Sequence, residues 1–254
     1  MKNLYLNLLG SLFFVGGSLN AYSADNTMIE RKVKQESLFG HYLHVTPTIT
    51  DDLSGIVIEL SAEDGMKDHL QLLSNISYDM DLAEQNLTIK DIMTLQPYAQ
   101  FMSGLDLSDN FIDNNFLEHL AMFTNLKKLN LSNNRFDDEG LNSVGKMKNL
   151  SSLNLYYNKV TPLGLRKLKG LNLTTLNVSC TFLENEGISV ILDLFPSLES
   201  LEVRACKIDE NALPYLLEMP HLKQIDLSSN DIEPNALNEF IINAQQKGLK
   251  VITK

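Results

Sequence analysis

The sequence predicts an α/β solenoid, a stack of short repeats in each of which a strand is followed by a helix. Three observations predict it. Residues 105–112 recur with the same leucine and asparagine positions at 129–136 and 153–160, at an offset of 24 residues. The first half of each copy alternates apolar and polar residues with the period of a strand, whereas the second half has the spacing of an amphipathic helix. Because so short a unit cannot enclose a core alone, its copies must stack on one another.

The strand half of each unit reads Leu-x-x-Leu-x-Leu-x-x-Asn-x-Leu, with a Phe in the last position in residues 126–136. Successive side chains of a strand face opposite sides, so Leu129 and Leu131 are expected to point inward and the polar residues that follow them outward. The chain leaves the strand at the asparagine, where a carboxamide can satisfy both backbone donors and acceptors. We expect the residues at this position to stack as a ladder with weaker members at Thr and Cys; they are Asn110, Asn134, Asn158, Thr181, Cys206 and Asn230.

This pattern resembles that of the leucine-rich repeat family over roughly residues 53–254. The resemblance implies a curved right-handed superhelix with a parallel sheet on its concave face and short helices on its convex face. The family pattern accepts the cysteine at 206, whereas the threonine at 181 departs from it. We expect degenerate units over 53–101, clear units over 102–245 and a truncated last unit over 246–254. The clear units open at Met102, Leu126, Leu150, Leu173, Leu198 and Leu222.

The second half of each unit is expected to be a helix on the convex side. Asp137, Thr161 and Asp209 are residue types that cap helix N-termini, and Pro162 and Pro234 stand where the first helical turn tolerates proline. In five units one position holds a small residue, which lets the helix pack closely. The small residues are Gly140, Gly164, Gly187, Ala212 and Ala236.

The first 23 residues have the layout of a secretory signal peptide. A short basic start precedes an apolar run from Leu4 to Leu19, and small and polar residues end at Ser23. The run is shorter than the roughly 20 residues of a spanning helix. We therefore expect cleavage near Ser23, a secreted or periplasmic protein and no stable membrane insertion. Residues 24–52 lack the repeat and are expected to form an N-terminal tail or cap.

The chain is acidic, with a formal net charge of −11 that becomes −12 without residues 1–23, which hold one lysine and no acid. This charge argues against nucleic-acid binding and favours a protein or peptide with a basic surface. The only cysteines, Cys180 and Cys206, lie on neighbouring units. Their side chains are expected to diverge, outward and inward respectively, but a disulfide between them stays an open alternative.

Nothing in the sequence predicts catalysis, a cofactor or a metal site. A phosphate-binding glycine loop, Gly-x-Ser-x-Gly, His-Glu-x-x-His and Cys-x-x-Cys are all missing from it. His41 and His44 have the spacing of metal ligands, yet no further ligand accompanies them, and metal sites normally need three or four. His69, His119 and His221 are expected at the surface. We therefore predict a non-enzyme.

The variable strand positions then remain as the candidate partner-binding surface. Two adjacent tyrosines, Tyr156 and Tyr157, stand where other units have Ser or Asn, and Arg204 follows two units later. Exposed Tyr and Arg are enriched among interface hot spots, although polar residues also serve simply as solvated strand ends and one Tyr could cover the other. The candidate concave-face residues are Asp81, Asp106, Asp109, Asn130, Asn154, Tyr156, Tyr157, Asn177, Glu202, Arg204 and Asp226.

We predict a non-catalytic protein-protein interaction module. The resemblance to secreted bacterial members of the family implies a bacterial source and a role in envelope or host contact. One alternative is a secreted effector that serves as the substrate-recognition adaptor of a host ubiquitin-ligase-type assembly. Another is self-association through the strand 249–252, but Lys250 and Lys254 would blunt that edge, which favours a monomer over a homodimer.

Overall fold

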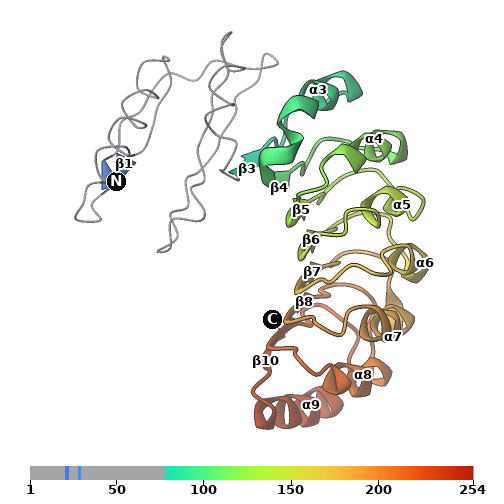
Figure 1. The fold of residues 1–254 in the computed structure, drawn as a ribbon. Coiled ribbons are helices and arrows are strands. Elements are labelled where there is room, and N and C mark those ends of the chain that lie inside the picture. Colours follow the sequence, from blue (N-terminus) through green and yellow to red (C-terminus); the bar gives the residue numbers. More distant parts are fainter. Residues whose placement is uncertain (1–20, 23–27, 30–77, 254) are drawn as a thin grey trace. The chain divides into compact units, whose positions relative to one another are not determined.

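The computed structural model describes residues 21–22, 28–29 and 78–253 (Figure 1). Two short strands, β1 (Ala21–Tyr22) and β2 (Met28–Ile29), pair antiparallel. The rest of the expected signal peptide, of the tail 24–52 and of the degenerate repeats up to residue 77 lies outside the described residues. The chain divides into two compact units, Met1–Leu82 with Phe101–Ser103, and Ala83–Gln100 with Gly104–Lys254.

The stacked strands confirm the predicted α/β solenoid. One eight-stranded parallel sheet has the order β10-β9-β8-β7-β6-β5-β4-β3, so each strand lies beside its neighbour in sequence. Its register places Leu105, Leu129 and Leu153 side by side, as the repeat requires. The strands are β3 (Tyr78–Asp81), β4 (Met102–Asp106), β5 (Lys128–Asn130), β6 (Ser152–Asn154), β7 (Thr175–Asn177), β8 (Ser200–Glu202), β9 (Gln224–Asp226) and β10 (Lys250–Ile252).

Short helices cover the opposite side of the second compact unit, and Figure 1 shows its strands on the concave side and its helices on the convex side. The α-helices are α3 (Ile89–Thr94), α4 (Asn114–Glu118), α5 (Leu141–Val144), α6 (Pro162–Arg166), α7 (Glu184–Leu194), α8 (Leu213–Glu218) and α9 (Pro234–Gln246). Three 3-10 helices are η1 (Gln96–Phe101), η2 (His119–Met122) and η3 (Glu210–Ala212). Among the described residues, none of these helices has the length and apolarity of a membrane span.

The core lies between the strands and the helices. The inward leucines of each strand are buried, including Leu129 and Leu131. The large side chains of Phe123, Phe136 and Phe195 are fully buried as well. The small helix position allows this close packing: a Cβ added at Gly140 would lie 2.6 Å from Leu117 Cδ1.

In four units an asparagine side chain at the ladder position ties the unit to the one before it. Asn134 Oδ1 accepts hydrogen bonds from the N–H groups of Asn110 and Ile112 at 3.2 and 2.8 Å. Its Nδ2 donates to the carbonyls of Leu107 and Leu131 at 2.9 Å each. Nδ2 also donates to the carbonyl of Ser132 at 3.2 Å. Because one carboxamide serves five backbone groups in two units, it joins the turns of both.

The equivalent position is weaker in two units. Thr181 Oγ1 donates to Val178 O within its own unit at 2.5 Å, and Cys206 Sγ donates to the same carbonyl at 3.2 Å. A hydroxyl or thiol has one hydrogen to donate and cannot replace a carboxamide, which has two. Both cysteines are free, with Cys206 buried and Cys180 half-buried. Burial raises the pKa of the Cys206 thiol, so it stays protonated.

Most expected helix caps are present. Thr161 caps α6, and its Oγ1 accepts from the Leu163 N–H at 3.2 Å. Pro162 and Pro234 stand in the first turns of α6 and α9, where proline fits because no intrahelical donor is lost. Asp209 caps η3 through its carboxylate.

The expectation that Asp137 caps a helix is wrong. α5 begins only at Leu141, four residues later, after an irregular turn. The carboxylate of Asp137 instead accepts from the Glu139 N–H in that turn at 3.0 Å and also bonds Asn114 of the preceding unit. Asp209 makes the same two kinds of contact, to Asn185 and to the N–H two residues further on, and does cap η3, so the contact with the neighbouring unit does not set where the helix begins.

Candidate binding surface

Polar side chains at the strand ends form hydrogen bonds with the backbone of their own repeat. Each accepts a hydrogen bond from the backbone N–H two residues further on, and this closes the turn that follows the strand. The distances lie between 2.8 and 3.0 Å. The residues concerned are Asp106, Asn130, Asn154, Asn177 and Asp226. These candidates therefore shape the strand face before they can serve a partner.

Several of these side chains also bond one another across units. Asn130 Nδ2 donates to Asp106 Oδ2 at 2.8 Å, and Asn177 Nδ2 donates to Glu202 Oε2 at 2.7 Å. Burial raises the pKa of Glu202, and the nearby carboxylate of Asp226 raises it further. The strand face is thus lined by a polar network that has an acidic end.

Tyr156 and Tyr157 are the large aromatic side chains exposed on the strand side of β6. They are 39% and 60% exposed, and their ring centroids lie 6.0 Å apart at an interplanar angle of 33°. Both rings therefore face solvent, and neither covers the other. Two adjacent rigid side chains of this kind offer much contact area for little loss of conformational entropy.

Arg204 lies close enough to Tyr156 to act on it electrostatically, and its carbonyl accepts from the Cys180 N–H at 2.7 Å. A hydrogen bond with Cys180 raises the pKa of Tyr156, while the charge of Arg204 acts in the opposite direction. Arg204 is exposed, and its backbone N–H is held by Ser179 Oγ at 3.0 Å. The structure thus brings Tyr156, Tyr157, Cys180 and Arg204 together, and we call these four residues the aromatic patch.

Two further candidates belong to repeats other than those that form the aromatic patch. Asp109 accepts a hydrogen bond from Asn133 Nδ2 of the next unit. Asp81 ends β3 in the other compact unit. His41, His44 and His69 fall outside the described residues, whereas His221 is exposed and His119 is half-buried. Among residues 21–22, 28–29 and 78–253, no cluster of His, Cys, Asp and Glu has the size of a metal site.

A backbone feature that the sequence analysis missed aims the side chains at the end of the strand face. The residue just before each ladder position has φ between 52° and 58°, the left-handed region that side chains rarely adopt. These residues are Asp109, Asn133, Tyr157, Cys180, Ala205 and Ser229. Asn and Asp tolerate this conformation best, so Tyr157 occupies a strained position, which only surrounding contacts can maintain.

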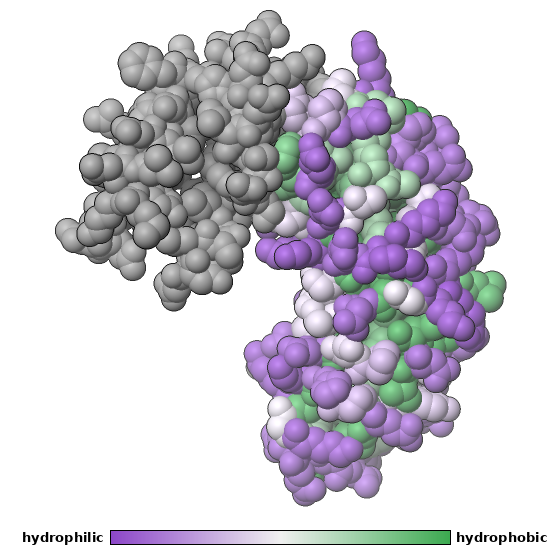
Figure 2. Space-filling view, in the orientation of Figure 1, coloured by the Kyte–Doolittle hydropathy of each residue, from purple (hydrophilic) through white to green (hydrophobic). Residues whose placement is uncertain are grey.

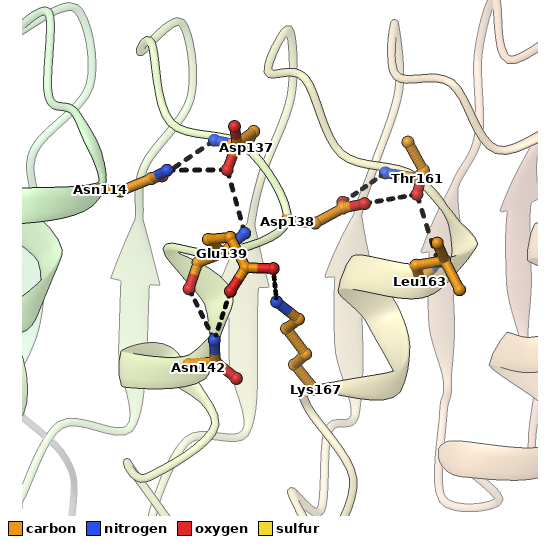
Figure 3. Close-up of polar contacts among 8 residues, drawn as sticks. All are labelled: Asn114, Asp137, Asp138, Glu139, Asn142, Thr161, Leu163 and Lys167. Atoms are coloured by element: carbon orange, nitrogen blue, oxygen red, sulfur yellow. Dashed lines mark hydrogen bonds and ion pairs between the residues drawn. The ribbon is translucent and has the colours of Figure 1, made fainter.

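A second set of bonds joins successive units on the helix side (Figure 3). Asn114 and Asp137 form a reciprocal pair, with Nδ2 to Oδ1 at 2.7 Å and the Asp137 N–H to Asn114 Oδ1 at 3.1 Å. Asp138 accepts from both the N–H and the hydroxyl of Thr161, at 2.8 and 2.5 Å. The equivalent residues Asn185 and Asp209 repeat the reciprocal pair further along.

The hydrogen bonds to Asp137 and Asp209 make the free energy of unfolding depend on pH. The hydrogen bond from Asn114, followed by that from the Glu139 N–H, holds the pKa of Asp137 below its ordinary value. The N–H of Asn211 and the amide of Asn185 lower the pKa of Asp209 in the same way. A lowered folded-state pKa contributes stability above the unfolded-state pKa, and this contribution is lost as pH falls through the folded-state pKa.

The Asn114→Ala variant is therefore expected to lose about 1 kcal/mol of unfolding free energy or less near neutral pH, because its partner is exposed. The difference from the parent protein should shrink as pH falls below about 4, the ordinary range of an Asp carboxyl, and through the lower folded-state pKa of Asp137. Urea unfolding at several pH values measures this. Asn115→Ala, at the exposed neighbouring position, is the matched control and should show the parent's pH dependence. A difference for Asn114→Ala that stays constant with pH contradicts the assignment.

Comparisons with known proteins agree with this geometry. A family model described as "Leucine Rich repeat" matches residues 124–145, 146–169 and 218–237. A crystal structure of an internalin (inlF) from Listeria monocytogenes str. 4b F2365 aligns with a TM-score of 0.51 and 19% identity, covering 72% of this chain and 49% of that chain. The chain thus spans about half the length of that internalin.

A second solved structure, the TLR13–ssRNA13 complex, aligns with a TM-score of 0.47 and 20% identity, over 72% of this chain and 30% of that one. The search of the curated proteins found no match. The likeness to the internalin structure is one of fold.

Proposed function

Because the chain is a leucine-rich repeat protein, we propose that it is a non-catalytic binding protein that holds a protein or peptide against its strand face. The observation that carries this proposal is the aromatic patch, with Tyr156 and Tyr157 exposed on a rigid sheet and Arg204 near them. Tyr and Arg are the residue types that most often dominate binding energy. The neighbouring strand-end residues are hydrogen-bonded within the chain, which keeps the surface in one conformation before binding.

The charge of the strand face indicates the kind of partner. Glu202 and Asp226 lie on adjacent strands at one side of the aromatic patch, and the whole chain is acidic, at −11. A partner with a basic segment beside an apolar one would complement both features. The apolar part would contact the tyrosines, and the basic part would contact the carboxylates.

Replacing the tyrosine pair is expected to weaken partner binding about thirtyfold, the effect of losing about 2 kcal/mol at a hot spot. The variant Tyr156→Ser/Tyr157→Asn copies the residues that the preceding unit has at 132 and 133, so the left-handed position keeps a residue type that suits it. The partner is first captured by a photo-cross-linking residue at position 156, and its affinity is then measured by calorimetry with both proteins.

The matched control is Leu163→Ala/Tyr215→Ala, which removes two exposed apolar side chains from the helix side. It should bind like the parent protein, and a cross-linking residue at position 163 should not capture the same partner. Equal affinity of the tyrosine variant and the parent protein would refute the role of the patch.

We also propose that the protein acts outside the cytoplasm, in envelope or host contact, after removal of residues 1–23. The layout of those residues supports this proposal. Intact mass of the protein recovered from its exporting host is expected to correspond to residues 24–254. Recovery of the full 254 residues from a host cytosol would instead favour the adaptor role in ubiquitin ligation.

A further inference from the structure

A second exposed row of side chains lies outside the strand face. It consists of the residues that directly follow the ladder positions in five successive units, where the chain passes from strand to helix. They are Phe111, Arg135, Lys159, Phe182 and Lys207, and we call them the rim row. All five are exposed, and the two phenylalanines are 55% exposed each. Exposed phenylalanines interleaved with cations are unexpected in a chain of charge −11.

Contacts between units place these residues side by side. The guanidinium carbon of Arg135 lies 4.2 Å from the centre of the Phe111 ring. The Phe182 N–H donates to Val160 O, next to Lys159, at 2.9 Å. An isolated parallel bridge pairs Lys159 with Asp137 in the unit of Arg135. On the far side of Phe182, the Glu184 N–H donates to the carbonyl of Cys206, which directly precedes Lys207.

Three residues of the row have a restricted conformation. Phe111 and Lys207 have φ of 58° and 59°, which bulky side chains avoid unless their surroundings impose it. The cation stacked on Phe111 further restricts both side chains of that pair. A surface so ordered before binding loses little entropy when a ligand docks.

The cations of the row are available to a ligand. Within residues 78–253 the ion pairs are Arg166–Glu186, Lys167–Glu139 and Lys223–Glu199, and none of them uses Arg135, Lys159 or Lys207. The acids nearest in sequence cap backbone N–H groups, although Asp137 also lies near enough to Lys159 for the lysine charge to lower the pKa of its carboxyl. They do so through Asp113 to Phe116 at 2.9 Å, Asp137 to Glu139 at 3.0 Å and Asp209 to Asn211 at 2.8 Å.

We propose that the rim row is a docking site for an acidic peptide segment with aromatic or aliphatic residues among its carboxylates. The carboxylates would pair with Arg135, Lys159 and Lys207, and the apolar side chains would contact Phe111 and Phe182. Four steps between adjacent strands span about 19 Å, the length of roughly six extended residues. This inference rests on the proposed function only in that both ligands are peptides or proteins. The rim row and the aromatic patch share no residue, and their ligands carry opposite charge.

A single-stranded nucleic acid shares part of this chemistry, since bases stack on aromatic rings and phosphates attract cations. The capping carboxylates of Asp113, Asp137 and Asp209 run along the helix side of the row. They would repel an uninterrupted chain of phosphates, whereas a peptide can place neutral residues opposite them. The short acidic peptide is therefore the better fit.

The probe is a fluorescent peptide of about eight residues in which Glu alternates with Leu or Phe, long enough to cross the row. Fluorescence anisotropy at low ionic strength measures its binding to the purified protein. Two comparison peptides have Lys in place of Glu, or Ser in place of Leu and Phe. The third comparison probe is an oligothymidylate of similar length.

Lys159→Glu/Lys207→Glu is expected to weaken binding of the acidic apolar peptide about tenfold. Lys146→Glu/Lys169→Glu changes the charge equally at exposed positions outside the row and should leave the affinity unchanged. Phe182→Ser should weaken binding, whereas Leu163→Ser, which removes a 65% exposed side chain from the helix side, should not.

The proposal is overturned if the acidic apolar peptide binds no more tightly than the Lys or Ser versions, if the control charge variant loses as much affinity, or if oligothymidylate is preferred. Tyr156→Ser separates the two surfaces. It is expected to leave peptide binding intact while it weakens the partner of the aromatic patch, so either function can fail without the other.

Discussion

Gly145→Ala is expected to lower the free energy of unfolding by about 3 kcal/mol, within the range of overpacking effects. Gly145 ends α5 with φ of −61°, a conformation open to any residue, so the penalty is purely steric. An added Cβ would overlap the carbonyl oxygen of Lys167 and lie 3.2 Å from its carbonyl carbon. Those atoms are backbone of the next unit, which cannot rotate aside as a side chain can, so the two units must move apart.

Gly248→Ala isolates that steric effect. Gly248 has φ of +74° and open space around its Cα, so alanine there meets only the strain of the left-handed region, about 1 kcal/mol. Urea unfolding followed by circular dichroism measures both variants. If Gly145→Ala is no less stable than Gly248→Ala, the close approach of α5 to the following unit is not a constraint on the fold.

Asn134→Ala is expected to cost about 3 kcal/mol. The substitution removes the acceptor that the N–H groups of Asn110 and Ile112 share and a donor to the carbonyl of Leu107, whereas the carbonyl of Leu131 keeps its hydrogen bond from Asn158 Nδ2 at 2.8 Å. Each buried unsatisfied group costs roughly 1–3 kcal/mol, and water entering the shortened side chain's space offsets part of the total.

Two further variants test the reason for this loss. Asn134→Thr keeps one donor and one acceptor, as Thr181 does, and should lie between Asn134→Ala and the parent protein in unfolding free energy. Asn142→Ala, on the exposed side of α5, should change the stability by less than about 0.5 kcal/mol. Equal losses at 134 and 142 would show that the ladder contributes nothing specific.

Most of the fold could be predicted from the sequence repeat. Alternating leucines set the faces of each strand, and the constant offset set the register that aligns Leu105, Leu129 and Leu153. The asparagine position followed from its capacity to donate and accept at once. These features depend on residues within one unit and their copies, which a single sequence displays directly.

The sequence analysis failed where residue type carries no signal. Asp137 and Asp209 bond the preceding unit in the same way, yet η3 begins directly after Asp209 whereas α5 begins four residues after Asp137. The left-handed backbone at Tyr157 carries no signal in a tyrosine. The rim row was missed because only the strand positions had been compared down the stack, although the same alignment at the next loop position shows Phe111 and Phe182.

The interface between the units of Asn158 and Thr181 combines two weaknesses. The Thr181 hydroxyl donates to a carbonyl of its own unit and therefore does not bond the unit before it. At the position where Asp138 and Asn185 each accept a hydrogen bond from an N–H of the following unit, the unit of Asn158 has Pro162, whose side chain cannot accept one. The exposed ion pair Arg166–Glu186 that crosses there adds little. On heating or under mechanical force, this interface between units should therefore separate first. The segments on its two sides should then unfold in separate transitions, and the solenoid should not unfold as a single cooperative unit.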